Sequence, residues 1–371
     1  MPARLLAEET AAGAPGHSRL RKPDQPGRTG RPGAGRGSRV APGDRAWRAP
    51  LGTAAWPVQR GHLPGPARAR LDPAGTSRRP VRPGVAELLE DFKFLPKWRI
   101  DDLMISFAAP GGGVGPHFDN YDVFLLQAHG RRRWQIGQMC DSDSPLLPHA
   151  DLKILAEFEP TDEWVLEPGD MLYLPPRLAH NGIAEDDCMT YSVGFRAPSA
   201  AEVLTHFTDF LGQFLPDEER YSDADIQPSE DPNQIQRDAL ERLKALLNEH
   251  MSDERLLMTW FGQFMTEPKY PELVAGIEIE EEDFLGALED GAILIRNPSA
   301  RMAWSEVGED LVLFASGQSR LVSTSLRELL KLICSADALH VENLGVWLAD
   351  DEGRTLLWEL VKQGSLGFAD E

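Results

Sequence analysis

The stretch from Gly111 to Gly137 constrains the fold of this chain more than any other. A glycine-rich turn leads into His117-Phe118-Asp119, and a run of branched and aromatic residues follows. We expect a β-strand here, and alternation along a strand would place His117 and Asp119 on one face. An imidazole beside a carboxylate makes up two thirds of a facial triad for non-haem Fe(II).

A histidine further along the chain is the candidate for the third ligand. His180 ends the segment 174–180 and lies 61 residues beyond Asp119, a span that suits a return strand across a small β-barrel. A single histidine or aspartate in such a position is most often structural, so the prediction rests on the set. We therefore predict that His117, Asp119 and His180 bind a metal ion.

Four segments carry a family resemblance: GGGVGPHFDNYDVF, GRRRWQIG, EPGDMLYLPPRLAH and YSVGFRAPS. They resemble the JmjC-type 2-oxoglutarate oxygenases, above all the bacterial branch that hydroxylates an arginine in ribosomal protein uL16. The resemblance runs from about residue 92 to residue 198 and continues more loosely to the C-terminus. It implies a mainly β fold with α, in which a double-stranded β-helix (a cupin or JmjC jelly roll) precedes a helical dimerisation region and a winged-helix-like C-terminal domain.

The resemblance also implies the cofactors. Fe(II) on the three ligands would leave positions for 2-oxoglutarate as cosubstrate and for O₂. Arg132, 15 residues after His117, matches the family's anchor for the distal carboxylate of 2-oxoglutarate. Its planar fork suits a bidentate carboxylate contact. Ser106 is expected to add a hydroxyl hydrogen bond to the same carboxylate.

The residues around these positions have less specific roles. Arg131 and Arg133 are expected to point away from the interior and to carry surface charge. Tyr121 and Asp122 follow the first metal pair, where a substrate guanidinium could be received, although either could equally be structural.

Charge is unevenly distributed along the chain. Residues 1–85 hold fifteen arginines and one lysine against five acids, a net of +11 that leaves −32 for the remainder of the −21 total. So acidic a body should repel nucleic acid and attract basic partners, such as a loop of uL16.

Four regions are predicted. Residues 1–84 hold 13 Pro and 13 Gly without Ile, Phe or Tyr, and we expect them to be disordered, a basic arm on RNA, or the product of a wrong start or reading frame. Residues 85–200 are expected to form the catalytic domain, 201–268 a helical region through which a homodimer forms, and 269–371 the winged-helix-like domain. Acidic residues on the helices of the last region favour protein interaction over DNA binding. Ser325 to Glu328 reads as a capping box that opens one of these helices.

Cysteine content and hydropathy bear on the compartment. Three scattered cysteines are too few for a disulfide framework or a Cys-rich zinc site. No apolar run approaches the length of a membrane span and no signal-peptide pattern is present. These features predict a cytoplasmic protein that does not bind membranes.

Three other readings remain open at this stage. The chain could be a 2-oxoglutarate oxygenase acting on a different protein residue, a metal-binding cupin of another chemistry, or a non-catalytic interaction module. Arg132 argues against the second reading, and the complete triad argues against the third.

Overall fold

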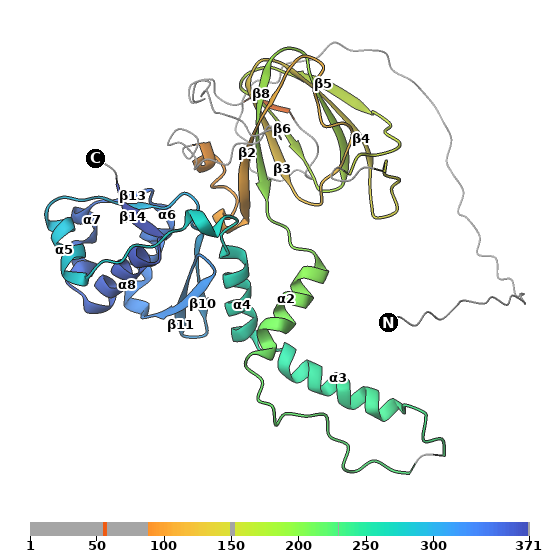
Figure 1. The fold of residues 1–371 in the computed structure, drawn as a ribbon, viewed down its shortest axis with the longest axis vertical. Helices are drawn as coiled ribbons and strands as arrows, with labels where there is room; N and C mark the ends of the chain where they lie inside the picture. The colour runs from red at the N-terminus through yellow and green to blue at the C-terminus, as the bar shows by residue number, and fades with distance from the viewer. Residues whose placement is uncertain (1–54, 58–87, 149–152, 229, 370–371) are drawn as a thin grey trace, which may run out of the picture. The chain divides into compact units, whose positions relative to one another are not determined.

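The computed structural model describes residues 55–57, 88–148, 153–228 and 230–369, with backbone placement alone at 55–57. Figure 1 shows, in chain order, a β-sheet domain, three helices and a mixed α/β domain. Apart from residues 55–57, the predictions for the low-complexity segment 1–84 lie outside the described residues.

Two antiparallel sheets form the N-terminal domain. The larger has the strand order β1-β6-β3-β8-β2 and the smaller the order β5-β4-β7, so the chain crosses repeatedly between them. The strands are β1 (Ala55–Pro57), β2 (Ile100–Ala108), β3 (Val123–His129), β4 (Arg132–Met139), β5 (Asp162–Leu166), β6 (Asp170–Leu174), β7 (Leu178–Ala184) and β8 (Cys188–Phe195), and a short 3₁₀ helix, η1 (Lys97–Arg99), precedes β2.

The edge strand β1 lies inside the low-complexity segment 1–84. Its three residues pair antiparallel with residues 170–172 of β6. Pairing with the edge of an existing sheet requires backbone N–H and C=O groups rather than apolar side chains, and Pro57 is tolerated on an edge strand.

Apolar side chains pack on both faces of the larger sheet. The space between the two sheets is filled by Val123, Leu125, Trp134, Ile136, Leu166, Leu172, Leu174 and Leu178. On the opposite face, Leu88 and Phe92 from the segment before β2 pack on Leu126 and Val193. Leu125 and Leu126 thus serve different cores, as alternation along β3 requires. Each such buried side chain contributes roughly 1.5–3 kcal/mol of transfer free energy.

Three helices follow the sheets, where a helical region was predicted: α2 (Ala200–Gly212), α3 (Arg237–Met251) and α4 (Glu254–Thr266). Helix α2 begins with a capping box of Ser199 and Glu202 that the sequence analysis did not identify, and Asp253 caps α4. Helix α3 has an amphipathic sequence but buries none of its side chains.

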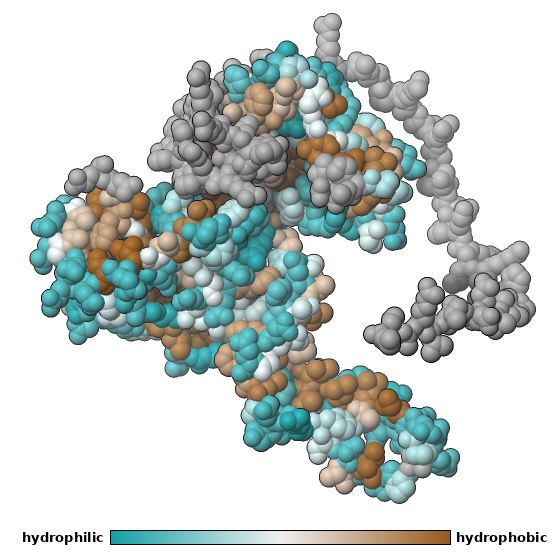
Figure 2. Space-filling view, viewed as in Figure 1, coloured by the Kyte–Doolittle hydropathy of each residue, from teal (hydrophilic) through white to brown (hydrophobic). Residues whose placement is uncertain are grey.

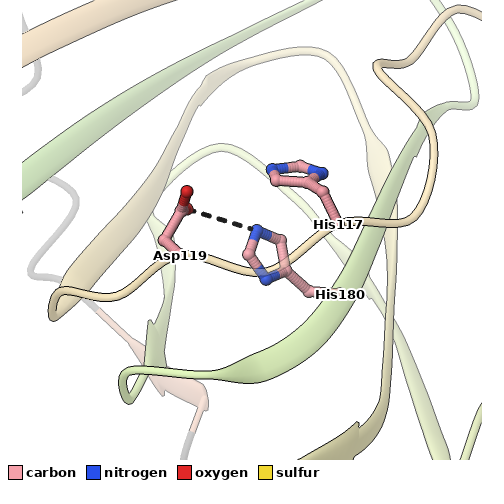
Figure 3. A group of neighbouring side chains, drawn as sticks. All are labelled: His117, Asp119 and His180. Atoms are coloured by element: carbon pink, nitrogen blue, oxygen red, sulfur yellow. Dashed lines mark ion pairs between the residues drawn. The ribbon is translucent and has the colours of Figure 1, made fainter. Parts of the chain in front are cut away.

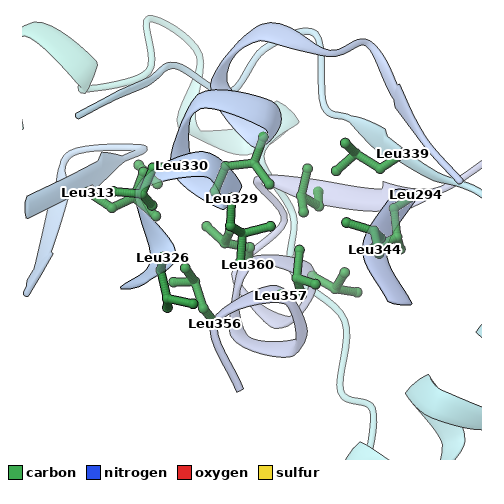
Figure 4. Packing of buried hydrophobic residues seen from close by; sticks show 14 of the residues in the cluster. Leu294, Leu313, Leu326, Leu329, Leu330, Leu339, Leu344, Leu356, Leu357 and Leu360 are labelled. Carbon is green, nitrogen blue, oxygen red and sulfur yellow. The ribbon is translucent and has the colours of Figure 1, made fainter. Parts of the chain in front are cut away.

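The C-terminal domain holds two small antiparallel sheets, of order β10-β11-β12 and β13-β9-β14. Figure 4 shows part of its core, in which leucines from the sheets and helices interdigitate. The elements are η2 (Pro271–Leu273), α5 (Glu281–Glu289), β9 (Leu294–Arg296), β10 (Met302–Val307), β11 (Asp310–Ala315), β12 (Gln318–Val322), η3 (Thr324–Leu326), α6 (Arg327–Ser335), β13 (Ala338–Leu339), α7 (Val341–Leu348), α8 (Asp351–Lys362) and β14 (Leu366–Phe368).

The capping box predicted at Ser325 is wrong. A 3₁₀ turn, η3, precedes α6, and the hydroxyl of Ser323 accepts from the backbone N–H of Ser325 at its start. Leu326 occupies the N-cap of α6 and makes no side-chain cap. The extra turn shifts the capping position two residues toward the N-terminus, which the spacing of Ser and Glu does not reveal.

Two predicted absences concern cysteines and membrane spans. Cys140, Cys188 and Cys334 are all free in the structure. Within the part of the chain that the structure describes, no helix combines the length and apolar character that crossing a membrane requires.

Candidate active site

The structure brings the side chains of His117, Asp119 and His180 together (Figure 3). One ligand atom from each lies within 4.8 Å of the others. Nε2 of His180 lies 3.7 Å from Oδ2 of Asp119, and the two imidazole rings are 4.3 Å apart between centroids. Two imidazoles and a carboxylate at this spacing form the ligand set of a facial triad.

The local structure around the first pair differs from the prediction. His117 and Asp119 lie outside any strand, and His117 forms only an isolated bridge with His180 of β7. The bridge has two hydrogen bonds, from N–H of His117 to O of His180 (3.0 Å) and from N–H of His180 to O of His117 (2.8 Å). Gly111 and Gly115 have φ of 77° and 98°, so the glycine-rich run bends out of regular strand geometry before His117.

Backbone hydrogen bonds also hold the carboxylate ligand. The N–H of Arg177 donates to the carbonyl of Asp119 over 2.6 Å. Arg177 has φ of 69°, a left-handed conformation that is uncommon for a residue other than glycine. The triad therefore rests on one bridge and one turn rather than on a continuous strand.

Hydrogen bonds orient both imidazoles. Nδ1 of His117 lies 2.9 Å from the carbonyl of Gly115, and Nδ1 of His180 lies 2.9 Å from the carbonyl of Leu178. The carbonyl of each pair can only accept, so each Nδ1 carries the proton and each Nε2 keeps its lone pair for a metal. Burial, with the neighbouring His117 second, lowers the pKa of His180 to about 4, which keeps this ring in its neutral, ligating form.

The two residues proposed to receive a guanidinium have different surroundings. Burial, with the neighbouring Asp119 carboxylate second, raises the pKa of Tyr121. Asp122 accepts from the hydroxyl of Tyr173 (2.7 Å) and from Nη2 of Arg99 (3.3 Å). Asp122 is therefore already paired within the protein, whereas Tyr121 lies against a triad member and is partly exposed.

Arg132 reaches into the space between the sheets. Only 6% of its surface is exposed, and burial lowers the pKa of its guanidinium. Nη1 donates to the hydroxyl of Thr190 (3.3 Å) and Nη2 to the carbonyl of Gly182 (3.3 Å), while Nε has no partner. No carboxylate among the described residues forms an ion pair with it. A buried cation without a counter-charge is costly unless a ligand supplies one.

A polar network missed by the sequence analysis supports this arginine. Thr190 Oγ1 donates to Oε1 of Gln127 (3.1 Å), and Nε2 of Gln127 donates to the carbonyls of His129 (2.8 Å) and Gly130 (3.2 Å). Gln127 is fully buried. Its signal in the sequence was the single amide in the apolar run from Val123, at a position whose alternation points inward.

The remaining predicted residues flank the network. Ser106 pairs with Thr190 in the β2–β8 register, and its hydroxyl lies 3.4 Å from the Thr190 carbonyl. Arg131 pairs with Asp186, and Arg133 pairs with Glu163 and Glu185. The prediction that Arg131 and Arg133 carry outward charge is confirmed.

Comparison with known proteins follows the same division of the chain. Residues 87–203 match the JmjC domain family, and residues 249–367 match the ROXA-like winged helix. Together they confirm the predicted fold class, a JmjC or cupin β-sandwich followed by a helical region and a winged helix.

Individual relatives extend the likeness over most of the chain. The ribosomal protein uL16 3-hydroxylase of Escherichia coli is 37% identical over 281 residues, which cover 75% of this chain and 74% of that protein. A probable ribosomal oxygenase of Haemophilus influenzae is 32% identical over 247 residues, 64% of this chain and 60% of that protein. The structure of YcfD, a ribosomal oxygenase from E. coli in complex with cobalt and 2-oxoglutarate, aligns with a TM-score of 0.64 at 34% identity, covering 77% of this chain and 75% of that one.

Proposed function

The chain belongs to the JmjC-domain ribosomal oxygenases, and from that premise we propose that it is an Fe(II)- and 2-oxoglutarate-dependent hydroxylase acting on an arginine of ribosomal protein uL16. The observation that carries the proposal is the buried guanidinium of Arg132, which has no counter-charge among the described residues and shares one sandwich with a His-Asp-His cluster. A metal alone would account for the cluster, but not for the cation.

The donor set fits the implied groups. His117, Asp119 and His180 offer the ligands that non-haem Fe(II) takes in 2-oxoglutarate oxygenases. Arg132 offers a planar cation to the distal carboxylate of the cosubstrate, which would satisfy its orphaned Nε and offset its burial. With these groups bound, the chemistry supplied is the insertion of one oxygen atom from O₂ into a C–H bond, coupled to oxidative decarboxylation of 2-oxoglutarate to succinate and CO₂.

The protein's own residues bind, orient and exclude water. The Nδ1–H groups of both histidines are tied to backbone carbonyls, so the rings cannot rotate away from a shared metal. The hydrogen bond from Arg132 to Thr190, and that from Thr190 to Gln127, hold the guanidinium in its buried position. Trp134, buried beside Arg132 with its ring centroid 4.7 Å from the guanidinium carbon, keeps this part of the sandwich dry. We assign Ser106 a supporting hydroxyl on the same side.

Charge and kinship support uL16 as the substrate. The chain beyond residue 85 carries a net charge of −32, which steers a basic ribosomal protein toward it. The E. coli relative is named for hydroxylation of uL16. Tyr121 is the residue we place next to the incoming arginine side chain, because it neighbours Asp119 of the triad and is partly exposed.

A uL16 peptide tests this function by mass spectrometry. We expect a gain of one oxygen atom that requires both Fe(II) and 2-oxoglutarate, with succinate released. Rising ionic strength should reduce turnover, because exposed charges are screened over about 8–10 Å near physiological salt. A peptide with lysine in place of the target arginine should lose most turnover, because lysine has no planar fork. Equal hydroxylation of both peptides would remove arginine as the target, and absence of succinate would favour a cupin of another chemistry or a non-catalytic module.

Helix α3 supports the homodimer that we propose. Leu240, Leu243 and Leu247 follow one face of the helix and are 48%, 44% and 49% exposed. Figure 2 shows apolar surface over this helix. Like faces of two copies would bury these leucines against each other, as an isologous contact requires.

The dimer is tested by light scattering during gel filtration. Leu243→Asp should shift the protein to monomer, because burying an unpaired carboxylate opposes association. Asn248→Asp adds the same charge elsewhere on α3 and should leave the mass unchanged. A monomeric wild-type protein would contradict the proposal.

The acidic C-terminal domain is proposed to contact protein rather than DNA. Glu328 on α6, Glu342 on α7 and Asp351 on α8 are exposed carboxylates that would repel phosphate.

A further inference from the structure

The guanidinium of Arg132 does not lie opposite Ala184, the residue that pairs with Arg132 in the strand register. In the β4–β7 ladder Arg132 pairs with Ala184, Trp134 with Gly182 and Ile136 with His180. The guanidinium nevertheless lies over Gly182, because Nη2 donates to the carbonyl of that residue. Along β7 this is one inward-facing position nearer to the metal ligand His180, a step of roughly 6.6–6.8 Å between alternate residues.

The missing side chain of Gly182 makes this position possible. A Cβ built there would lie 2.7 Å from Nε of Arg132 and 2.7 Å from two carbons of the Trp134 ring. Those distances are below ordinary contact. The cation and the indole therefore occupy the volume that any other residue at position 182 would fill.

The backbone of β7 has little freedom to move away from such a side chain. One edge of the strand is hydrogen bonded to β4. On the other edge, N–H of Gly111 donates to O of Ala184 (2.7 Å) and N–H of Ala184 donates to O of Gly112 (2.9 Å). Added volume at position 182 would thus be absorbed by Arg132 and Trp134 rather than by the strand.

We propose that Gly182 is a specificity-determining residue: it sets the distance between the Arg132 cation and the metal triad, and so selects the length of the 2-oxo diacid that the site accepts. The inference rests on the proposed function, because it assumes that the diacid spans the metal and Arg132. Gly182 itself touches neither end of the diacid and acts through the position of the guanidinium. Trp134 holds that position from the other side.

A direction of change follows from the register. A methyl group at position 182 displaces the guanidinium toward Ala184, away from His180. The gap between cation and metal then suits a diacid with one more methylene, 2-oxoadipate, better than it suits 2-oxoglutarate. The ligand triad is not touched, so the metal should bind as before.

Calorimetric titration of the Co(II)-loaded full-length protein tests this without reference to turnover. For Gly182→Ala we expect the Kd of 2-oxoglutarate to rise about tenfold, which is the effect expected of overpacking at a rigid site. The Kd of 2-oxoadipate should rise less or should fall. The ratio of the two Kd values, rather than either alone, is the readout that a loss of general order would not move.

Gly194→Ala is the matched control. A Cβ at position 194 would meet Asp102 Oδ1 at 3.6 Å and the Tyr121 ring at 3.7 Å, which are ordinary contacts. We expect the ratio of the two Kd values to stay at the wild-type value in this variant. A shift as large as that of Gly182→Ala would overturn the assignment of selectivity to position 182.

A second variant tests the inference if Gly182→Ala by itself prevents folding. Trp134→Phe removes the far edge of the indole and makes room, so Gly182→Ala in this background should fold and still shift the ratio toward 2-oxoadipate. An unchanged ratio in the folded variant overturns the inference while wild-type binding of 2-oxoglutarate leaves the proposed function standing. Failure of wild-type protein to bind 2-oxoglutarate with Co(II) overturns both.

Discussion

The interior of the JmjC sandwich and the core of the winged-helix domain are packed on different principles. The C-terminal core is a continuous cluster of apolar side chains, most of them leucines. The sandwich holds four of the six buried polar side chains in the described residues: Gln127, Arg132, His180 and Thr190. It also contains two donors without partners, Nε of Arg132 and Nε1 of Trp134.

The two cores differ in whether their buried groups stabilise the fold without a bound ligand. Buried apolar groups stabilise without partners, whereas buried donors and charges stabilise only when every one is paired. The winged-helix domain meets the first condition by itself. In the sandwich the guanidinium of Arg132 has no counter-charge among the described residues, and the proposed dicarboxylate would supply one.

Removing a metal ligand should give the largest effect. Asp119→Ala should abolish hydroxylation of the uL16 peptide, because two imidazoles alone do not complete the triad. The free energy of unfolding of the metal-free protein should change little, since the carboxylate is partly exposed. Peptide mass spectrometry and urea denaturation measure the two effects, and full activity in this variant would remove the triad.

A truncation in the leucine core should have the opposite profile. Leu357 is fully buried on α8. The substitution Leu357→Ala should lower the free energy of unfolding by about 2–5 kcal/mol, because it leaves an unfilled cavity. Urea denaturation measures the loss. The Kd of 2-oxoglutarate for the Co(II)-loaded protein at low temperature should stay at its wild-type value, and a parallel loss of affinity would mean that the two cores are not independent.

Replacing the buried cation should separate binding from stability within one residue. Arg132→Met should raise the Kd of 2-oxoglutarate by about 10- to 100-fold, because a charge-assisted contact of roughly 1.5–3 kcal/mol is lost. Without cosubstrate the variant should be as stable as wild type or more so, because an apolar isostere relieves an uncompensated charge.

Arg133→Met is the control for that comparison. Arg133 lies on the same strand, faces outward and pairs with Glu163 and Glu185. Exposed ion pairs of this kind contribute little to stability, so both the affinity for 2-oxoglutarate and the free energy of unfolding should hardly change. If Arg132→Met lowers stability while affinity stays unchanged, the cation is structural and the cosubstrate anchor lies elsewhere.

The spacing of residues in the sequence predicted the members of the metal triad, but the predicted local structure at His117 was wrong. His117, Asp119 and His180 were chosen as a set, and the structure brings their ligand atoms together. The strand expected at His117 proved to be a single bridge after a glycine-rich bend. Backbone pairing there depends on β7, which lies about sixty residues away in the chain and exerts no influence on local propensity.

The amino-acid sequence specifies which kinds of group the site contains and their order along the chain: the two histidines, the aspartate, the arginine run and the acidic body. The family resemblance implied that Arg132 faces inward, and alternation along the strand then placed Arg131 and Arg133 on the opposite face. Tertiary structure alone decided the features that depend on distance between strands. These are the pairing of β1 with β6, the network from Gln127 through Thr190 to Arg132, and the approach of that guanidinium to Gly182. A sequence pattern indicates which face of a strand a side chain occupies. How far the side chain extends along that face depends on the residue opposite, and Gly182 leaves room for the guanidinium because it has no side chain.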